Sequence, residues 1–270
     1  MTKNSVILVG CGNMGFAMLQ GWLSSGKLQA SDVTVVEPAD GLRERAAELG
    51  VKALADSTGI TGSPRLIIIA VKPQVIQDIL PAYQSYAPAA TFVSVAAGTP
   101  VSLFETILGE QTAIIRCMPN TPAAIGKGMM VTFANSNVAP DDKRFTEELL
   151  ETSGKVAHID DEKLMDAVTA VSGSGPAYIF HFIECLTQAG VMAGLPQDIA
   201  AMLAMQTVYG AGALAKTSTD TPSQLRINVT SPNGTTAAAL EVLMGNNRLQ
   251  NLMTEAVEAA RSRSEELGKA

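Results

Sequence analysis

Basic side chains are scarce in this sequence and are nowhere gathered into a run. Lys and Arg number 19 against 26 Asp and Glu, which gives a formal net charge of −7. Nucleic-acid binding normally needs a Lys/Arg-rich face, so this balance argues against a nucleic-acid partner. No stretch of about 18 uncharged apolar residues occurs, and the apolar residues near the N-terminus are too few for a signal peptide. We therefore expect a cytoplasmic protein that is not associated with a membrane.

Cysteine and histidine are also rare, with three and two residues. Cys11, Cys117 and Cys185 are widely spaced, so they suggest no metal-type pairing and favour a reducing compartment. His158 ends an expected strand, and His181 lies in an apolar helical stretch, where a packed histidine is the simpler interpretation. No Ser-His-Asp set, carboxylate pair or metal cluster is evident, so no metal site is predicted. Any chemistry must therefore use few protein acids and bases.

What the sequence does have is a glycine-rich turn directly after a short apolar strand at 6–9. The turn has the pattern G-x-G-x-x-G and consists of Gly10, Cys11, Gly12, Asn13, Met14 and Gly15. Gly10 permits the sharp turn, Gly12 lets the backbone approach a pyrophosphate, and Gly15 lets the following helix lie close to the strand. N–H groups at the start of that helix would hold the diphosphate. A second strand ends in Glu37, which is placed to accept hydrogen bonds from an adenosine ribose.

Two differently patterned parts follow one another along the chain. Up to residue 160, short apolar strands alternate with helical stretches, which is typical of a mostly parallel sheet covered on both faces. Strands are expected at 6–9, 33–36, 66–70, 91–95, 113–117, 129–133 and 155–158. Beyond residue 160 only helices are expected, at 162–171, 176–193, 196–215, 222–229, 235–244 and 247–267. We predict an α/β Rossmann-type N-terminal domain over 1–160 and an all-α C-terminal dimerisation domain over 161–270.

The dimerisation part of this prediction comes from the helical stretch 199–215, which is rich in Ala, Met and Leu and poor in charge. A helix that is apolar all round is usually buried, and a domain of about 110 residues has little interior. We infer that this helix forms a subunit interface in an intimate dimer.

Small, polar and proline-rich segments follow three of the expected strands. Ligands in such sheets bind beyond the carboxyl ends of the strands, so these segments would converge on one edge. Their sequences are Val71-Lys72-Pro73-Gln74, Ala96-Ala97-Gly98-Thr99 and Met118-Pro119-Asn120-Thr121-Pro122. Lys72 is the only cation among them. It is either a surface lysine or a contact for the ribose or diphosphate of a dinucleotide.

Two turns of small residues, at 172–176 and 230–236, precede helices in the second domain. N–H groups at a helix start, together with Ser and Thr hydroxyls, suit a carboxylate, although plain N-capping explains either turn alone. Two such turns after a dinucleotide module favour a substrate site. Hydride transfer to an already electrophilic centre fits this protein, because the cofactor then supplies the reactive group and the protein supplies position.

Six motifs, in the expected order and over nearly the whole chain, closely resemble pyrroline-5-carboxylate reductases. They are GCGNMG at Gly10, VKP at Val71, AAG at Ala96, RCMPNTPA at Arg116, SGSGPA at Ser172 and TSPNGTT at Thr230. The resemblance implies the same two-domain fold, with a homodimer interlocked through the helical domain and often assembled into a decamer. It also implies reduction of 1-pyrroline-5-carboxylate, a small-molecule substrate, to L-proline by NADPH or NADH, the last step of proline biosynthesis.

Matching positions in these motifs imply the site residues. N–H groups and hydroxyls of the second domain would bind the substrate carboxylate, from Val229, Ser231, Gly234, Thr235 and Thr236. Thr236 would also be the hydroxyl nearest the imine nitrogen, which makes Thr236 and Ser231 the candidate catalytic residues. The expected cofactor-binding residues are Gly10, Gly12, Asn13, Met14, Gly15, Glu37, Val71, Lys72, Pro73, Ala97, Gly98 and Asn120. Of these, Lys72, Pro73, Ala97, Gly98 and Asn120 would line the nicotinamide side.

Three positions need separate comment. Ile227 stands where the family commonly has an acidic residue, which removes a charged group next to the substrate site. Asn233 replaces a second glycine, and Asn tolerates the left-handed conformation better than most residues. Glu37 would repel a 2′-phosphate, so we expect NADH to be accepted at least as well as NADPH.

Two other functions stay open from the sequence. One is a related NAD(P)-dependent reductase of another cyclic imino acid or of a β-hydroxyacid. The β-hydroxyacid enzymes depend on a catalytic lysine in the helical domain, and neither Lys163 nor Lys216 lies at a glycine-rich helix start. The other is a non-catalytic nucleotide-binding scaffold, against which the intact 230–236 loop argues.

Overall fold

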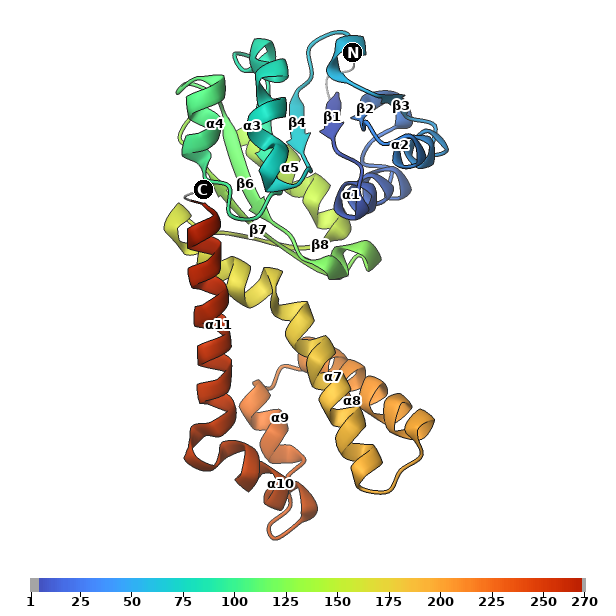
Figure 1. The fold of residues 1–270 in the computed structure, drawn as a ribbon, viewed down its shortest axis with the longest axis vertical. Coiled ribbons are helices and arrows are strands. Elements are labelled where there is room, and N and C mark those ends of the chain that lie inside the picture. Colours follow the sequence, from blue (N-terminus) through green and yellow to red (C-terminus); the bar gives the residue numbers. More distant parts are fainter. Residues whose placement is uncertain (1–4, 269–270) are drawn as a thin grey trace. The chain divides into compact units, whose positions relative to one another are not determined.

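The computed structural model describes residues 5–268. The chain divides into two compact units, one formed by the residues up to 174 together with those from 260 onward, the other by residues 175–259 (Figure 1). The first unit contains the β-sheet, and the second consists of helices and their connections. The domain boundary expected after residue 160 stays a prediction. The two compact units are defined by the contacts within each of them, and such contacts do not test where one domain ends and the next begins.

Eight strands form one sheet in the described part of the first unit, in the order β3-β2-β1-β4-β5-β6-β7-β8. They are β1 (Val6–Val9), β2 (Val33–Val36), β3 (Lys52–Leu54), β4 (Leu66–Ile69), β5 (Thr91–Ser94), β6 (Ile114–Met118), β7 (Gly128–Ala134) and β8 (Gly154–His158). All neighbouring strands pair in parallel except β6 and β7. The expected strands and the mostly parallel sheet are confirmed. The sequence reading missed β3, a three-residue edge strand without a buried residue.

The strand order reverses between β1 and β4, which is where an open α/β sheet presents a ligand crevice. Every residue of β1, β2, β4 and β5 is buried, as expected for a parallel sheet covered on both faces. Successive β1 residues belong to different clusters of the core: Val6 and Leu8 to one, Ile7 and Val9 to the other. The apolar run in the sequence thus follows from two-sided burial.

The helices of the first unit are α1 (Asn13–Ser24), α2 (Asp40–Ala47), α3 (Ile76–Ile79), α4 (Val101–Leu108), α5 (Pro140–Leu150) and α6 (Met165–Val168). Helix α1 buries Met18, Leu19 and Trp22, and the Trp22 indole N–H donates to the Leu149 carbonyl at 3.2 Å. This packing holds α1, and the glycine turn before it, against the sheet.

The second unit contains α7 (Gly175–Met192), α8 (Gln197–Thr217), α9 (Pro222–Asn228), α10 (Thr235–Met244) and most of α11 (Arg248–Leu267), whose end belongs to the first unit. These helices are confirmed within a few residues of their expected bounds. The helical stretch expected over 162–171 is confirmed, but it is not a single α-helix. There a 3-10 turn, the short α6 and a π-helical turn at 169–173 follow one another.

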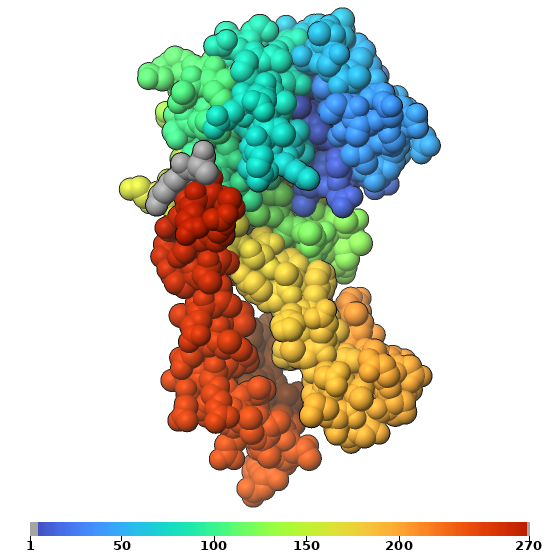
Figure 2. Space-filling view, viewed as in Figure 1, coloured from blue at the N-terminus to red at the C-terminus, as the bar shows by residue number. Residues whose placement is uncertain are grey.

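Large apolar side chains of the second unit are exposed, including those of α7 and α8. Figure 2, coloured by residue number, shows the surface that these helices form. Phe180 is 59% exposed, Met202 59% and Tyr209 61%, while the buried residues of α8 are Ala200 and Ala204. A face this apolar needs a covering surface. Among residues 5–268, no helix has both the length and the apolar character needed to cross a bilayer.

Candidate functional site

The turn after β1 uses its three glycines for two different purposes. Gly10 has φ +90°, and a Cβ at this position would lie 2.6 Å from the Ala70 carbonyl oxygen. A Cβ at Gly15 would overlap the Gly10 carbonyl oxygen. Both glycines are therefore required by the fold itself. A Cβ at Gly12, in contrast, would meet nothing within 4 Å, so the space beside Gly12 is open for a ligand.

A cavity of about 630 Å³ opens beside this turn, at the carboxyl ends of β1, β2 and β4. The expected cofactor residues that line it are Gly10, Gly12, Glu37, Val71 and Lys72. The other expected cofactor residues of the glycine motif are not among the described lining residues and form the first turn of α1: Asn13, Met14 and Gly15. Because Gly12 provides no side-chain cap, the first N–H groups of α1 are suited to an anion.

Glu37 is a buried carboxylate, 7% exposed, at the end of β2. One oxygen accepts the Cys11 N–H at 2.7 Å, and the other accepts the Ala39 N–H at 3.0 Å. The side chain thus ties the glycine turn to the start of α2 while lining the cavity. Asp56 and Asp78 line the same cavity, and Lys72 is the only cation among the described lining residues. The cavity therefore carries an excess of negative charge.

Two arginines near this cavity donate to backbone carbonyls. Arg43 donates to the Glu37 and Pro38 carbonyls and pairs with Asp40. Arg45 donates to the Cys11 carbonyl at 3.0 Å and lies 3.9 Å from the centre of the Phe16 ring. Neither arginine is among the described residues that line the cavity.

A second cavity, of about 690 Å³, lies beyond β4 and β5. Pro73, Ala97 and Gly98 line it, as do Asp78, which also lines the first cavity, and Leu267 from the end of α11. Asn120 lines neither cavity. Its side chain donates to the Ser172 carbonyl at 3.1 Å and accepts the Met129 N–H at 2.8 Å, so it connects the segment before α7 to β7.

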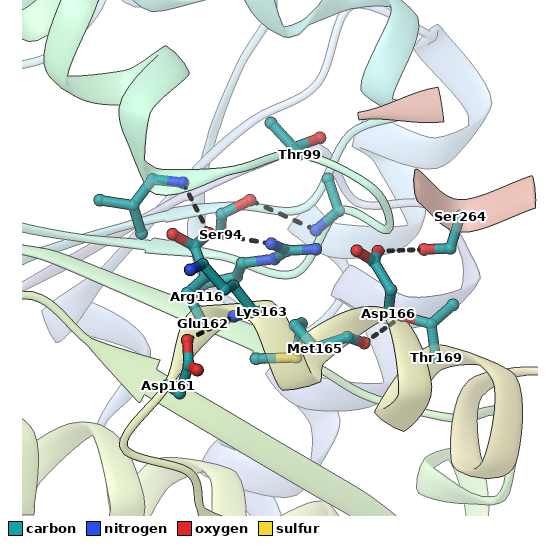
Figure 3. A network of polar contacts seen from close by, with 12 residues as sticks. Ser94, Thr99, Arg116, Asp161, Glu162, Lys163, Met165, Asp166, Thr169 and Ser264 are labelled. Carbon is teal, nitrogen blue, oxygen red and sulfur yellow. Dashed lines mark hydrogen bonds and ion pairs between the residues drawn. The ribbon is translucent and has the colours of Figure 1, made fainter. Parts of the chain in front are cut away.

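The loop between β5 and α4 is held by a polar network (Figure 3). One oxygen of Glu162 accepts the Val101 N–H at 2.9 Å and pairs with Arg116 at 2.8 Å. The Ser264 hydroxyl donates to Asp166 at 2.6 Å. Sequence reasoning missed Glu162, Asp166, Ser264 and Leu267. The contacting residues are 46 positions apart for Arg116–Glu162 and 98 for Asp166–Ser264, and no local spacing pattern links such positions.

The stretch 172–176 differs from the expected exposed turn. Residues 169–173 form a π-helical turn, and the Ser174 N–H donates to the Thr169 carbonyl at 2.8 Å. Gly173 is closely packed, because a Cβ there would overlap the flexible end of the Met118 side chain, which would have to move. The prediction of a turn that exposes N–H groups is therefore wrong here, because the chain continues from one helix into the next.

The loop 230–236 in the second unit keeps the expected geometry. Asn233 has φ +61°, which confirms that Asn takes the left-handed conformation here. The Gly234 N–H donates to the Ser231 carbonyl at 3.0 Å and is therefore not available to a ligand. Gly234 has no side chain that could cap the start of α10. The first N–H groups of α10, at Thr235 and Thr236, are then suited to an anion.

The side chains around this loop are accessible in the single chain. Val229, Ser231 and Thr235 are exposed, and Thr236 is half-buried. Ile227, 54% exposed, contributes its carbonyl to the turn by accepting the Thr230 N–H at 3.0 Å. The loop thus brings together hydroxyls and N–H groups without a charged side chain.

Burial keeps two of the three thiols neutral. It raises the pKa of Cys11 to about 11, although nearby Arg45 lowers it, and the pKa of Cys117 to about 12. Neither thiol can act as a nucleophile near neutral pH. In the described part of the chain, no group of three His, Cys, Asp or Glu side chains could hold a metal ion.

Family models match both parts of the chain. One for pyrroline-5-carboxylate reductase dimerisation matches residues 162–267, and one for NADP oxidoreductase, coenzyme F420-dependent, matches residues 5–98. The pyrroline-5-carboxylate reductase of Pseudomonas aeruginosa is 35% identical to this chain, and the alignment covers 100% of this chain and 98% of that relative. That of Synechocystis is 38% identical and covers 97% of both.

Solved structures give the same result. A pyrroline-5-carboxylate reductase from Coxiella burnetii superposes with a TM-score of 0.93 at 32% identity, covering 100% of both chains. The Plasmodium falciparum pyrroline carboxylate reductase with NADP bound gives a TM-score of 0.85 at 29% identity, covering 99% of both.

Proposed function

The chain belongs to the pyrroline-5-carboxylate reductase family, and from that membership we propose which of its residues carry out the family's reaction. The enzyme reduces 1-pyrroline-5-carboxylate to L-proline with a hydride from NADPH or NADH, the last step of proline biosynthesis. Because the chain belongs to this family, we set aside the reductase of another substrate and the non-catalytic scaffold, the two functions that stayed open from the sequence.

The first cavity is proposed to hold the adenosine and diphosphate half of the cofactor. The open space at Gly12 and the uncapped N–H groups at the start of α1 support this assignment, since a diphosphate needs both close backbone approach and N–H donors. Glu37 is proposed to accept hydrogen bonds from the ribose. Lys72, in the same lining, is a cation suited to the phosphates or the second ribose.

The second cavity is proposed to lie on the nicotinamide side, with Pro73, Ala97 and Gly98 in its wall. When bound there, the nicotinamide supplies the hydride. The chain's own contribution is position, which is enough because the imine carbon is already electrophilic. Asn120, whose side chain is bonded within the protein, is proposed to act on this side by fixing the surrounding segments.

The loop 230–236 is proposed to bind the substrate. The N–H groups of Thr235 and Thr236 at the start of α10 and the Ser231 hydroxyl would hold the carboxylate, with Val229 and Gly234 shaping the turn. Thr236 would donate from its hydroxyl to the imine nitrogen. The single observation that carries this assignment is the uncapped start of α10, with hydroxyls beside it.

The test is Thr236→Ala, with Thr254→Ala as the matched control. Thr254 is an exposed threonine of α11 in the same unit, and its hydroxyl bonds only to its own helix among the contacts described. Loss of a hydrogen-bond donor at a reacting centre should lower kcat by about a hundredfold or more. Binding of NADH, followed by its fluorescence, should not change. Wild-type turnover in Thr236→Ala would exclude this role.

We also propose that the helical unit pairs with a second copy of the chain. The dimerisation family model over 162–267 and the exposed apolar faces of α7 and α8 support a homodimer. A decamer would be an assembly of such dimers, and light scattering distinguishes the two masses. A reducing, cytoplasmic setting is part of the proposal too, supported by three cysteines that form no disulfide.

A further inference from the structure

The loop between β5 and α4 has only weak side-chain bonds of its own, from Ser94 and Thr99. Ala96, Ala97 and Gly98 are small, and Gly98 has φ +68°, a conformation that favours glycine. The bonds within the loop are long, with the Ser94 hydroxyl 3.4 Å from the Ala96 nitrogen. The shape of the loop is therefore set by what lies against it.

Glu162 holds one end of this loop. Its carboxylate oxygen accepts the Val101 N–H, where the loop enters α4, and at the same time pairs with Arg116 of β6 (Figure 3). The Arg116 side chain is 7% exposed and that of Glu162 25%. A charge pair with this little solvent contact has a well-defined geometry. The start of α4 is thereby fixed to the sheet.

The last turn of α11 lies directly against the middle of the loop. A Cβ at Gly98 would lie 3.2 Å from the Leu267 Cβ and 3.5 Å from the Ser264 carbonyl oxygen. Ser264 is 4% exposed, and its hydroxyl donates to Asp166 at 2.6 Å. Asp166 follows Glu162 by one helical turn, so the segment 162–166 holds both the loop and the helix end that covers it.

We propose that Glu162, Ser264 and Leu267 are positioning residues for the nicotinamide half of the cofactor. The inference rests on the proposed function, in which Ala97 and Gly98 line the nicotinamide side. Glu162 and Ser264 are among the lining residues of neither cavity, and Leu267 is in the wall of the second one; all three act by fixing the backbone of Ala97 and Gly98. A shift of about 1 Å in a group that positions reactants can lower a rate by about a hundredfold, so loosening this loop should affect hydride transfer.

The test compares two ligands that share the adenosine half. ADP-ribose lacks the nicotinamide, so calorimetric titration with NADH and with ADP-ribose separates the two halves of the site. The variant is the double substitution Ser264→Ala with Leu267→Gly, because the Leu267 atom that lies against Gly98 is its Cβ, which alanine would keep. We expect the Kd for NADH to rise about tenfold and kcat to fall about tenfold. The Kd for ADP-ribose should stay within about twofold of the wild type, because the first cavity contains neither residue.

The matched control is Glu266→Gln, on the same turn of α11. Glu266 forms an exposed ion pair with Arg263 and lines neither cavity, so its removal should change none of these constants. A second variant, Glu162→Gln, keeps an acceptor oxygen for Val101 but leaves Arg116 without its counter-charge. It should show the same selective loss of NADH affinity.

Two results would overturn the inference. Equal weakening of NADH and ADP-ribose binding would mean that the residues serve general stability. If the double variant binds and turns over NADH as Glu266→Gln does, the loop keeps its position without the Ser264 and Leu267 side chains. Failure of the wild-type protein to reduce the imine would instead count against the proposed function, and the comparison of the two ligands would still decide the role of the loop.

Discussion

The acidic lining of the first cavity predicts that NADH is the better hydride donor, and Glu37 is the residue that tests this. NADPH differs from NADH by a 2′-phosphate on the adenosine ribose, next to the expected position of Glu37. Lys72 is the only cation among the described lining residues, against Glu37, Asp56 and Asp78. Arg43 and Arg45 donate to backbone carbonyls, and neither is among the described residues that line this cavity.

The size of the effect follows from the burial of Glu37. Two like charges about 4 Å apart repel by about 1 kcal/mol in water and about 4 kcal/mol at an effective dielectric constant near 20. Glu37 is 7% exposed but borders an open cavity, so we take an intermediate repulsion of about 2 kcal/mol. That corresponds to a preference for NADH of roughly 30-fold in kcat/KM.

The variant is Glu37→Gln, which removes the charge and keeps the shape. It also removes one of the two bonds to the Cys11 and Ala39 N–H groups, because the amide NH2 cannot accept, but that loss affects both cofactors alike. The ratio of kcat/KM for NADPH to that for NADH should therefore rise roughly 30-fold. Glu44→Gln, which makes the same charge change on the exposed side of α2, should leave the ratio unchanged. A strong NADPH preference in the wild type, or an unchanged ratio in Glu37→Gln, would refute the reasoning.

Three further predictions follow. Gly12→Ala should fold normally yet bind NADH at least about tenfold more weakly, as measured by NADH titration. Gly15→Ala should lower the Tm in thermal unfolding, because its Cβ would overlap the backbone. The free energy of unfolding should fall as pH rises from about 9 to about 12. The reason is that the thiol pKa is 9.0 in the unfolded chain but about 11 for Cys11 and about 12 for Cys117 in the folded protein. Cys117→Ala should flatten the dependence of Tm on pH, and an unchanged slope would contradict the assignment. Phe180→Asp should reduce the mass measured by light scattering to that of one chain, and an unchanged mass would exclude this face from the dimer.

The parts of the fold that were predicted from the sequence are those with a local cause. Two-sided burial makes β1 an apolar run, and Gly10 is demanded by a positive φ directly after it, so strand and turn can be recognised together. The edge strand β3 was missed because one exposed and two half-buried residues leave no hydrophobic pattern in the sequence. The stretch 172–176 was misread because glycine also serves close packing, here against Met118.

The candidate site follows the same rule. The residues of the glycine turn and of the 230–236 loop belong to contiguous motifs, so the sequence could identify them. The support of the β5–α4 loop depends on Glu162 meeting Arg116 and on Ser264 meeting Asp166, pairs that are brought together only by the folded sheet and the return of α11. The hydrogen bonds that Glu37 accepts from the Cys11 and Ala39 N–H groups likewise could not be predicted from the sequence, because they depend on the folded backbone.

The central claim is that this chain transfers a hydride from a nicotinamide cofactor to 1-pyrroline-5-carboxylate. The most direct measurement follows the absorbance of NADH and of NADPH with purified protein, with and without the imine. We expect rapid oxidation that depends on the imine, faster with NADH than with NADPH at equal concentration. Cofactor binding without oxidation when the imine is present would contradict the claim.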